Sequence, residues 1–266
     1  MITLLGYLLA VGIGLLLGLI GGGGSILTVP ILVYLLKIPA TLATSYSLFI
    51  VGTTALIGCI QQMLRGNVAY TAGILFGFPS VIGVYISRKW LLPLIPDLIF
   101  SEYSFSLSKD TILIVLFAVL MITSSLSMIY KKSPPKIIEK KPHLVVFEGL
   151  VVGVFTGLIG AGGGFLVIPA LVNWVGLDMK VAVGTSLLII ALKSLIGFIG
   201  DLQRDVQMNW ELLLFFSGCA FTGILIGSYF NKRFSTNLLK QVFGWFVLVV
   251  GVVMIVAELA GRLAAI

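Results

Sequence analysis

The chain has 266 residues, of which 59% are hydrophobic and only 10% are charged, and its formal net charge is +7 at pH 7. In soluble domains about a quarter of all residues are charged, so this composition excludes a water-soluble globular protein of this size. The apolar residues fall in runs of about 18 or more, the length of a helix that spans a bilayer. The composition therefore predicts an all-α polytopic membrane protein embedded in lipid.

The basic residues and the few reactive side chains exclude further classes of protein. The basic residues form short clusters between apolar runs, which is typical of cytoplasmic loops and does not indicate nucleic-acid binding. Cys59 and Cys219 lie inside apolar runs without a C-x-x-C partner, so neither a disulfide framework nor a zinc site is predicted. The single histidine, His143, follows a loop rich in Lys and Pro. We therefore expect no catalytic residue, no metal and no cofactor, and the protein is not predicted to be an enzyme.

In chain order, the first predicted helix is residues 2–20, which lack the basic start and the cleavage site of a signal peptide and are expected to be retained. The apolar runs cover approximately residues 2–20, 26–37, 42–62, 68–92, 110–130, 144–160, 165–177, 181–200, 210–230 and 238–260. Residues 131–143 carry prolines and a cluster of lysines, which cannot lie in hydrocarbon. We interpret them as a cytoplasmic basic linker between an N-terminal transmembrane repeat (residues 1–130) and a C-terminal transmembrane repeat (residues 144–266).

The two halves resemble each other in sequence at a constant offset of 139 residues. The segment Gly18–Ser25 corresponds to Gly157–Gly164, and Pro30 corresponds to Pro169. Roughly seventeen of about forty aligned positions are identical without a gap. A shared lipid environment explains leucine opposite leucine, but it does not place glycines and prolines in phase. The sequence therefore predicts an internal duplication.

In each copy, the second apolar run is too short to cross a bilayer. Residues 26–37 and 165–177 span about 18–20 Å as helix, against a hydrocarbon core of about 30 Å. Each follows a glycine cluster and carries a proline, Pro30 or Pro169, which we place near the start of the helix. We therefore predict two homologous repeats, each with about four full transmembrane helices and one half-helix after a glycine break.

The distribution of charge favours half-helices that cross the membrane. With crossing half-helices about ten basic residues share one side and about six the other, whereas re-entrant half-helices give about eight on each. This arrangement inverts the second repeat relative to the first and places both termini outside. The residues that it assigns to the outer side are Lys37, Arg88, Lys89, Lys109, Arg204 and Arg262, together with Asp97, Glu102, Asp110, Asp201, Asp205 and Glu211. Inverted repeats with broken helices bind substrates near the bilayer midplane.

The glycine breaks are the main candidate for a binding site. Backbone groups left unpaired at membrane depth cost several kcal/mol each, so a break must be buried by protein or line a wet cavity. The helix that follows a break offers free N–H groups and the positive end of its dipole, which favour an anion. The alternative is that these glycines only allow close helix packing. The candidate residues of the breaks are Gly21, Gly22, Gly23, Gly24, Gly160, Gly162, Gly163 and Gly164.

Hydroxyl groups near the breaks are a second set of candidates, because they can donate to an oxyanion without a fixed charge. They are Ser25, Thr28, Ser45, Ser47, Thr185 and Ser186. Ser47 and Ser186 coincide across the repeat. The alternative is that each hydroxyl bonds the carbonyl of its own preceding turn.

Lys193 is the most unusual single residue. It lies well inside the apolar run 181–200, and no acidic residue lies within four positions of it. A buried ammonium without a partner is costly, so Lys193 should face a cavity, a carbonyl or an anion unless it extends to the interface. Its counterpart in the first half is Thr54, so a site built on this lysine is asymmetric.

The segment Gly157–Gly164, Pro169 and the run Ala182–Ser186 resemble the TauE/SafE sulfite-exporter family, also called the 4-toluene sulfonate uptake permease family. Both halves carry the resemblance, so it covers essentially the whole chain. It implies a multi-pass permease of the prokaryotic inner membrane that moves sulfite, a sulfonate or another organosulfur anion, in some members coupled to protons. It does not identify the anion, the direction of transport or the coupling ion, and a homo-oligomer is left open.

The leading hypothesis is thus a secondary transporter for a small anion, bound near the membrane midplane by the starts of the two half-helices. A passive anion channel is the nearest alternative. A membrane-embedded sulfur-relay protein or enzyme is a further one, with little support from the sequence because no histidine lies in the spans.

Overall fold

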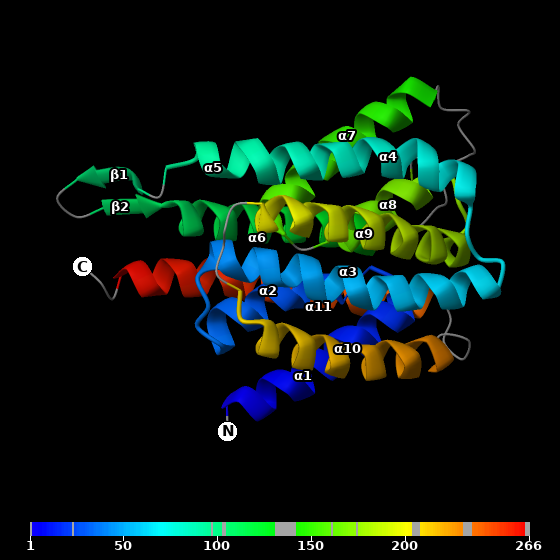
Figure 1. Cartoon of the computed structure of the whole chain (residues 1–266), viewed down its shortest axis with the longest axis horizontal. Coiled ribbons are helices and arrows are strands. Elements are labelled where there is room, and N and C mark those ends of the chain that lie inside the picture. Colours follow the sequence, from blue (N-terminus) through cyan, green and yellow to red (C-terminus); the bar gives the residue numbers. More distant parts are fainter. Residues whose placement is uncertain are drawn as a thin grey trace.

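The computed structural model describes residues 2–22, 24–96, 98–102, 105–130, 142–160, 162–173, 175–203, 208–230 and 236–263. Long helices run side by side along the long axis of the molecule (Figure 1). In the first half they are α1 (Ile2–Ile20), α2 (Ser25–Pro30), the π-helix η1 (Ile31–Leu35), α3 (Ala40–Leu64), α4 (Tyr70–Ile86), the π-helix η2 (Ser87–Leu91), α5 (Leu92–Leu94) and α6 (Lys109–Tyr130). In the second half they are α7 (Pro142–Ile159), α8 (Gly164–Asn173), α9 (Met179–Leu202), α10 (Trp210–Phe230) and α11 (Thr236–Leu263).

The helices confirm a polytopic membrane protein. Five helices of the described chain are long and apolar enough to cross a membrane: Ala40–Leu64, Tyr70–Leu94, Lys109–Ser127, Met179–Leu202 and Trp210–Phe230. Shorter apolar helices lie at Leu5–Ile20, Ser25–Leu35, His143–Ile159 and Gly244–Ala260. Each apolar run predicted from the sequence therefore corresponds to a helix.

Two local features differ from the sequence prediction. An antiparallel hairpin of β1 (Leu98–Glu102) and β2 (Phe105–Ser108) connects α5 to α6, in a stretch for which no element was predicted. Pro30 and Pro169 were predicted near the starts of their helices, but each is the sixth residue of its helix. A proline there removes a backbone hydrogen bond inside the helix, and the π-helix η1 begins directly after Pro30.

The predicted linker, residues 131–143, lies outside the described residues except for its last two positions. Those two, Pro142 and His143, already belong to α7. The division of the chain at this segment therefore stays a prediction.

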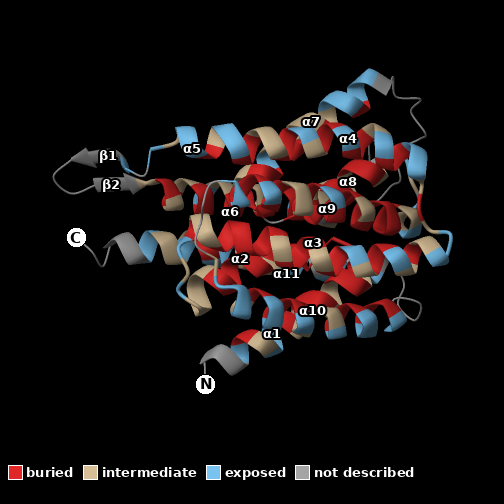
Figure 2. Cartoon of the chain, in the orientation of Figure 1, coloured by how far each residue is buried: buried red, intermediate tan, exposed pale blue. Residues whose placement is uncertain are grey.

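The centre of the molecule is formed by α3 and α9. In each, 72% of the residues in the apolar span are buried, against 44% in α4 and in α10. Figure 2 shows this buried central layer and the exposed outward faces of the surrounding helices. Gly52 faces Leu195 and Gly58 faces Leu187, so the two central helices run antiparallel. In Figure 1, α3 runs from left to right and α9 from right to left.

The remaining helices pack in pairs that join the two halves of the sequence. Helix α1 packs along α10, α4 packs along α7, and α6 packs along α11. In the first two pairs the neighbours run parallel, because Gly14 and Gly18 face Ala220 and Ile224, and Gly149 and Gly153 face Phe76 and Ser80. Figure 1 shows α10 running from left to right and α4 from right to left. Helices α3 and α9 thus run in opposite directions, and so do α4 and α10.

Backbone hydrogen bonds recur at the same offset as the sequence. At the ends of the short helices, Leu36 N–H donates to Ile31 O at 3.2 Å and Val175 N–H donates to Ala170 O at 3.2 Å. Next to these bonds, Lys37 and Gly176 both have positive φ, at 57° and 78°. The two short helices therefore end in the same kind of local turn.

Candidate functional site

Each glycine break ends a long helix with a residue in the left-handed region. Gly21 (φ 86°) donates its N–H to Leu17 O at 2.7 Å, and Gly160 (φ 70°) donates its N–H to Thr156 O at 2.9 Å. In the second break, Gly162 and Gly163 also have positive φ, at 60° and 64°. Left-handed φ is costly for residues with a side chain, so the backbone of the breaks requires glycine here.

The two breaks touch each other through their backbones. Gly22 and Gly164 are so close that a methyl group on either one would overlap the main chain of the other. All the break glycines that the structure describes are buried: Gly21, Gly22, Gly24, Gly160, Gly162, Gly163 and Gly164. Gly23 lies outside the described residues. The breaks are therefore covered by protein in this structure, and they form one region rather than two.

Lys193 lies against the second break. Its side chain is 1% exposed, and its ammonium Nζ is close to the position that a methyl group on Gly163 would occupy. Nζ donates to Thr156 Oγ1 at 3.2 Å. Thr156 is its only hydrogen-bond partner in the part of the chain that the structure describes, and no carboxylate pairs with it there. The buried lysine predicted from the sequence is thus present, and it does not extend to the membrane surface.

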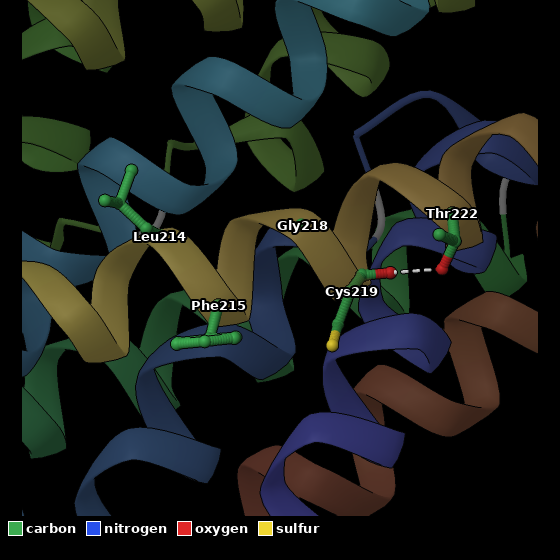
Figure 3. Close-up of a pocket in the computed structure, with 5 residues that line it drawn as sticks. All are labelled: Leu214, Phe215, Gly218, Cys219 and Thr222. Carbon is green, nitrogen blue, oxygen red and sulfur yellow. Dashed lines mark hydrogen bonds between the residues drawn. The ribbon is translucent and has the colours of Figure 1, made fainter.

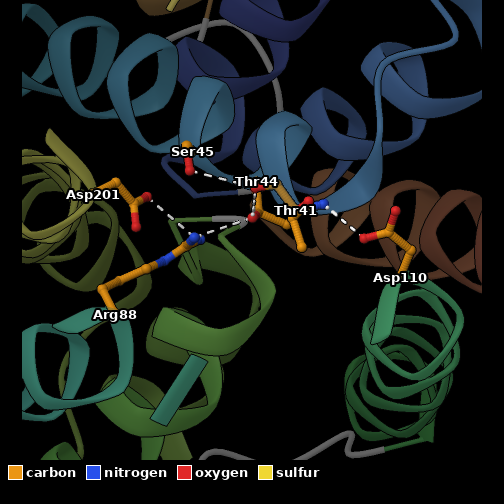
Figure 4. A network of polar contacts seen from close by, with 6 residues as sticks. All are labelled: Thr41, Thr44, Ser45, Arg88, Asp110 and Asp201. Carbon is orange, nitrogen blue, oxygen red and sulfur yellow. Dashed lines mark hydrogen bonds and ion pairs between the residues drawn. The ribbon is translucent and has the colours of Figure 1, made fainter. Parts of the chain in front are cut away.

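Arg88 is a second buried cation at the same break. The π-helix η2 carries it into the core, where it is fully buried and its guanidinium lies against Gly160. Nη1 lies 3.2 Å from Asp201 Oδ2 and donates to Thr44 Oγ1 at 3.1 Å. Figure 4 shows the guanidinium between these two groups. Short π-helical segments often lie at functional sites, because the wider turn displaces one side chain from the regular helix face.

The burial of Arg88 and Asp201 was not predicted from the sequence. Both were assigned to the outer side of the membrane, which the burial does not test, and the structure places both fully inside the protein. Helix α9 extends to Leu202, so Asp201 stays inside the helix and meets Arg88 from η2. Thr44 and Thr156, which bind the two cations, were also not among the predicted residues. The sequence signal that could have pointed to the ion pair is the presence of an Arg and an Asp next to apolar runs that carry few other charges.

The first break is lined by apolar side chains. A methyl group on Gly21 would meet Val183, and one on Gly24 would meet Leu17 and the backbone of Ile13. Ser25 Oγ donates to Gly22 O at 2.7 Å and so holds the turn of the break. The two breaks also differ in backbone, because Gly24 has φ −66° where its counterpart Gly163 has φ 64°. Among the described contacts, only the second break has charged side chains against it.

The predicted hydroxyls fall into two groups. Ser25, Ser45 and Ser186 bond carbonyls of their own segments, and Thr185 Oγ1 accepts from Ala69 N–H at 2.9 Å. Ser47 and Thr28 are fully buried and have no hydrogen-bond partner among the described residues. Ser47 lies between Thr44 and Val51 on the face of α3 that contacts the second break. Ser194, close to Gly162, is likewise buried without such a partner in the described chain.

A surface groove on α10 lies apart from the breaks. It has a volume of about 530 Å³ and is lined by Leu214, Phe215, Gly218, Cys219 and Thr222. Figure 3 shows that these residues all come from this one helix, and Thr222 Oγ1 donates to Cys219 O at 2.8 Å. The groove is almost entirely apolar, so it lacks the polar groups that would orient an anion.

The apolar spans, the interrupted helices and the buried charges together define a multi-pass membrane protein with a polar region enclosed in its core. The family model described as sulfite exporter TauE/SafE matches residues 5–254, which is nearly the whole chain. The protein therefore belongs to the TauE/SafE sulfite exporter family, whose members are membrane transporters.

Relatives from bacteria and archaea agree with this assignment. The chain is 28% identical over 254 residues to a probable membrane transporter protein of Xylella fastidiosa, covering 91% of each chain. It is 28% identical to the probable membrane transporter protein YunE of Bacillus subtilis, covering 92% of this chain and 96% of the relative. It is 28% identical to a probable membrane transporter protein of Methanocaldococcus jannaschii, covering 77% of this chain and 75% of the relative. No solved structure matches the chain.

Proposed function

We propose that this protein is a secondary transporter of the prokaryotic inner membrane that carries a small anion, namely sulfite, a sulfonate or another organosulfur anion. We place the binding site at the second glycine break, where Lys193, Thr156 and the backbone of Gly160, Gly162 and Gly163 meet. The family and the relatives support transport, and the chemistry of the break supports an anion.

The observation that carries the proposal is the buried ammonium of Lys193 against Gly163, with Thr156 as its hydrogen-bond partner. A buried charge is costly unless an opposite charge compensates it. A transported anion supplies that charge for part of the cycle. The start of α8, directly after the break, adds N–H groups and the positive end of the helix dipole.

Hydroxyl groups complete the proposed site. Ser47 and Ser194 face the second break and have no hydrogen-bond partner among the described residues, so each can donate to an oxyanion without breaking an existing bond. In the proposed site, Thr28, Ser25 and the described glycines of the first break (Gly21, Gly22 and Gly24) form the opposite wall, which Gly22 joins to the second break at Gly164. Ser45, Thr185 and Ser186 are engaged with the backbone and hold the helices that carry the site.

We further propose that two inverted repeats provide alternating access. The recurring backbone hydrogen bonds and the opposite directions of corresponding helices support this arrangement. The break glycines are buried, so an anion can enter or leave only when the two repeats move relative to each other. With a single buried site between them, such a movement would expose the anion to one side of the membrane at a time.

Reconstitution into liposomes tests the proposal. Uptake of labelled sulfite, thiosulfate, sulfoacetate and taurine is measured at several concentrations, with empty liposomes as the control. Saturable uptake of at least one anion, with trans-stimulation by unlabelled anion on the other side, is expected for a carrier. Flux that rises linearly with concentration would indicate a channel, and no flux of any of the four anions would contradict the proposed function.

A further inference from the structure

Lys193 uses only one of the three N–H donors that an ammonium group has. Nζ donates to Thr156 Oγ1 at 3.2 Å, and the hydroxyl of Thr156 itself donates to Gly153 O at 3.2 Å. The threonine oxygen is thus an acceptor for Lys193 and brings no negative charge to it. Lys193 forms no ion pair with a carboxylate among the residues that the structure describes. Its side chain is 1% exposed, so bulk solvent does not reach the nitrogen.

In such surroundings, the charge of a lysine depends on what else the site holds. A buried ammonium without a counter-charge is less stable than the neutral amine, because burial removes the hydration that stabilises the charge. The neutral amine still has N–H groups and can keep a hydrogen bond to a hydroxyl. A bound oxyanion reverses the balance, since its negative charge stabilises the ammonium in the same low-dielectric surroundings.

On this basis, and resting on the proposed anion transport, we propose that Lys193 carries the proton that moves with the anion. In the empty site Lys193 is a neutral amine. When an anion binds, the nitrogen lone pair takes up one proton from the water on the same side of the membrane, and the ammonium pairs with the anion. When the anion leaves on the other side, that N–H bond breaks and the proton enters the water there. The protein is thus an anion–proton symporter with one proton for each anion.

Two hydroxyls next to Lys193 bind the anion in this cycle without a change in their own charge. Ser194 follows Lys193 on α9, is fully buried, and would lie 3.2 Å from a methyl group on Gly162. Ser47 lies on the face of α3 that contacts the same break. Neither hydroxyl has a hydrogen-bond partner within the described chain. Serine hydroxyls stay neutral, so Lys193 is the titratable side chain of the proposed site.

Arg88 and Asp201 are the other charged residues at this break. Arg88 lies against Gly160, three residues from the point where Lys193 meets the break, and it forms an ion pair with Asp201. A guanidinium keeps its proton at every pH that a folded protein tolerates. Asp201 lies eight residues after Lys193, which is about 12 Å along α9. The pair brings one charge of each sign, so it does not compensate the charge of an ammonium at Lys193.

The remaining titratable groups of the helices that contact α9 lie farther from Lys193 or at the surface. They are Tyr46 and Cys59 on α3, Tyr70 and Tyr85 on α4, Lys89 on η2, His143 and Glu148 on α7, and Lys180 on α9 itself. Glu148 lies eight residues before Thr156, which is about 12 Å along α7. Tyr46 and Cys59 lie six and seven residues from Gly52, which faces Leu195.

The first test uses wild-type protein in detergent and a weakly buffered solution that reports proton uptake. Methanesulfonate and thiosulfate are the probes, because both stay fully ionised around neutral pH and cannot supply the proton themselves. We expect about one proton to be taken up for each anion bound. The affinity should fall as the pH rises, by up to about tenfold for each pH unit, which is the limit for one linked proton.

Lys193→Arg separates the charge from the proton, because a guanidinium is cationic but does not release its proton. The variant should still bind methanesulfonate, while the number of protons taken up per anion falls at least about tenfold and the affinity no longer depends on pH. Lys180→Arg, at an exposed position of the same helix, is the control and should match the wild type within about twofold. If Lys193 only stabilised the fold, Lys193→Arg would change thermal stability and leave the number of protons per anion unchanged.

Liposomes with a pH-sensitive dye inside then give the stoichiometry of transport by the wild type. Uptake of each methanesulfonate should bring in about one proton, and an inward proton gradient should drive accumulation of the anion.

Three outcomes would overturn the assignment. They are anion binding by the wild type without proton uptake, wild-type transport without proton movement, and unchanged proton uptake in Lys193→Arg. The first two measurements need no variant, so they decide the matter even if Lys193→Arg does not fold or bind. Absence of any anion binding and transport by the wild type would instead contradict the proposed function, and this inference with it.

Discussion

The two glycine breaks begin with the same left-handed turn but have different surroundings. In both, the first glycine caps a long helix in the left-handed conformation, and in both the same pairs of positions make contact. Gly21 meets Val183 where Gly160 meets Thr44, and Gly24 meets Leu17 where Gly163 meets Thr156. At every one of these contacts the first break has an apolar residue and the second a polar one.

Within the proposed function, this difference places the binding site at one of the two breaks. Each break begins with a glycine of positive φ, Gly21 or Gly160, whereas the chemistry depends on single side chains around it. In the first half, the hydroxyl of Thr54 donates to the carbonyl of Ile50 in the same helix. Its counterpart in the second half, Lys193, places a charged ammonium against the break. In the proposed site, single side chains at these contact positions therefore place the charge at the second break.

The largest effect is expected for removal of the charge that distinguishes the second break. Lys193→Met should reduce saturable anion uptake by about 100-fold, because truncating one member of a buried charge interaction costs a few kcal/mol. The matched change in the first copy, Thr54→Val, should leave uptake within about twofold, since Thr54 bonds only its own helix. Equal losses in the two variants would contradict the asymmetric site.

A methyl group at the second break should reduce both stability and transport. In Gly163→Ala, the left-handed φ and the overlap with Thr156 should together cost about 1–3 kcal/mol, and displacement of Lys193 should reduce uptake. Thermal unfolding in detergent and liposome uptake measure the two effects. The control is Gly218→Ala on α10, where a methyl group meets nothing within 4 Å. Normal uptake by Gly163→Ala would argue against backbone contact with the anion.

A smaller effect is expected when Lys193 keeps its charge and loses its hydrogen-bond partner. Thr156→Val preserves the shape of the side chain and removes only its hydrogen bond to Lys193. A hydrogen bond contributes about 1 kcal/mol, so the apparent affinity for the anion should weaken about fivefold. Thr123→Val, on the exposed face of α6, serves as the control because its hydroxyl bonds only its own helix. Concentration dependence of uptake gives the affinity, and an unchanged value would remove Thr156 from the site.

The smallest effect separates two serines that correspond across the repeat. Ser47 has no hydrogen-bond partner among the described residues and faces the second break, whereas Ser186 bonds Val183 O at 2.8 Å. Ser47→Ala should weaken anion binding about threefold without reducing thermal stability. Ser186→Ala should lower stability slightly and leave binding unchanged. If Ser47→Ala binds the anion normally, the hydroxyl has no part in the site.

Much of the fold could be predicted from the sequence, because it depends on local signals. Apolar runs of bilayer length predicted the helices. Glycines that recur at a constant offset in the sequence predicted the breaks between helices. Lys193 could be identified because a cation in the middle of an apolar run has no ordinary place in lipid. The hairpin of β1 and β2 was missed, since its mixture of apolar and polar residues has no strong period.

The polar surroundings of the second break could not be predicted in the same way. Arg88 and Asp201 lie near the ends of apolar runs, where charged residues usually face the headgroups. Their burial depends on η2 packing against α9, a contact between residues that are far apart in the sequence. Thr44 and Thr156 have ordinary positions in their helices, and only the fold brings them to the cations. Pairing across the two halves is thus the information that a single sequence lacks.

The contact between Gly22 and Gly164 has a mechanical consequence. At this point the two halves meet main chain to main chain, and neither glycine has a side chain that must change rotamer when the halves slide or tilt. In the proposed movement of the two halves, this contact can therefore serve as the point of rotation, because only backbone atoms meet there. A single methyl group on either glycine would hold the two halves apart at this contact. It would thereby fix the protein in whichever orientation accommodates the extra volume.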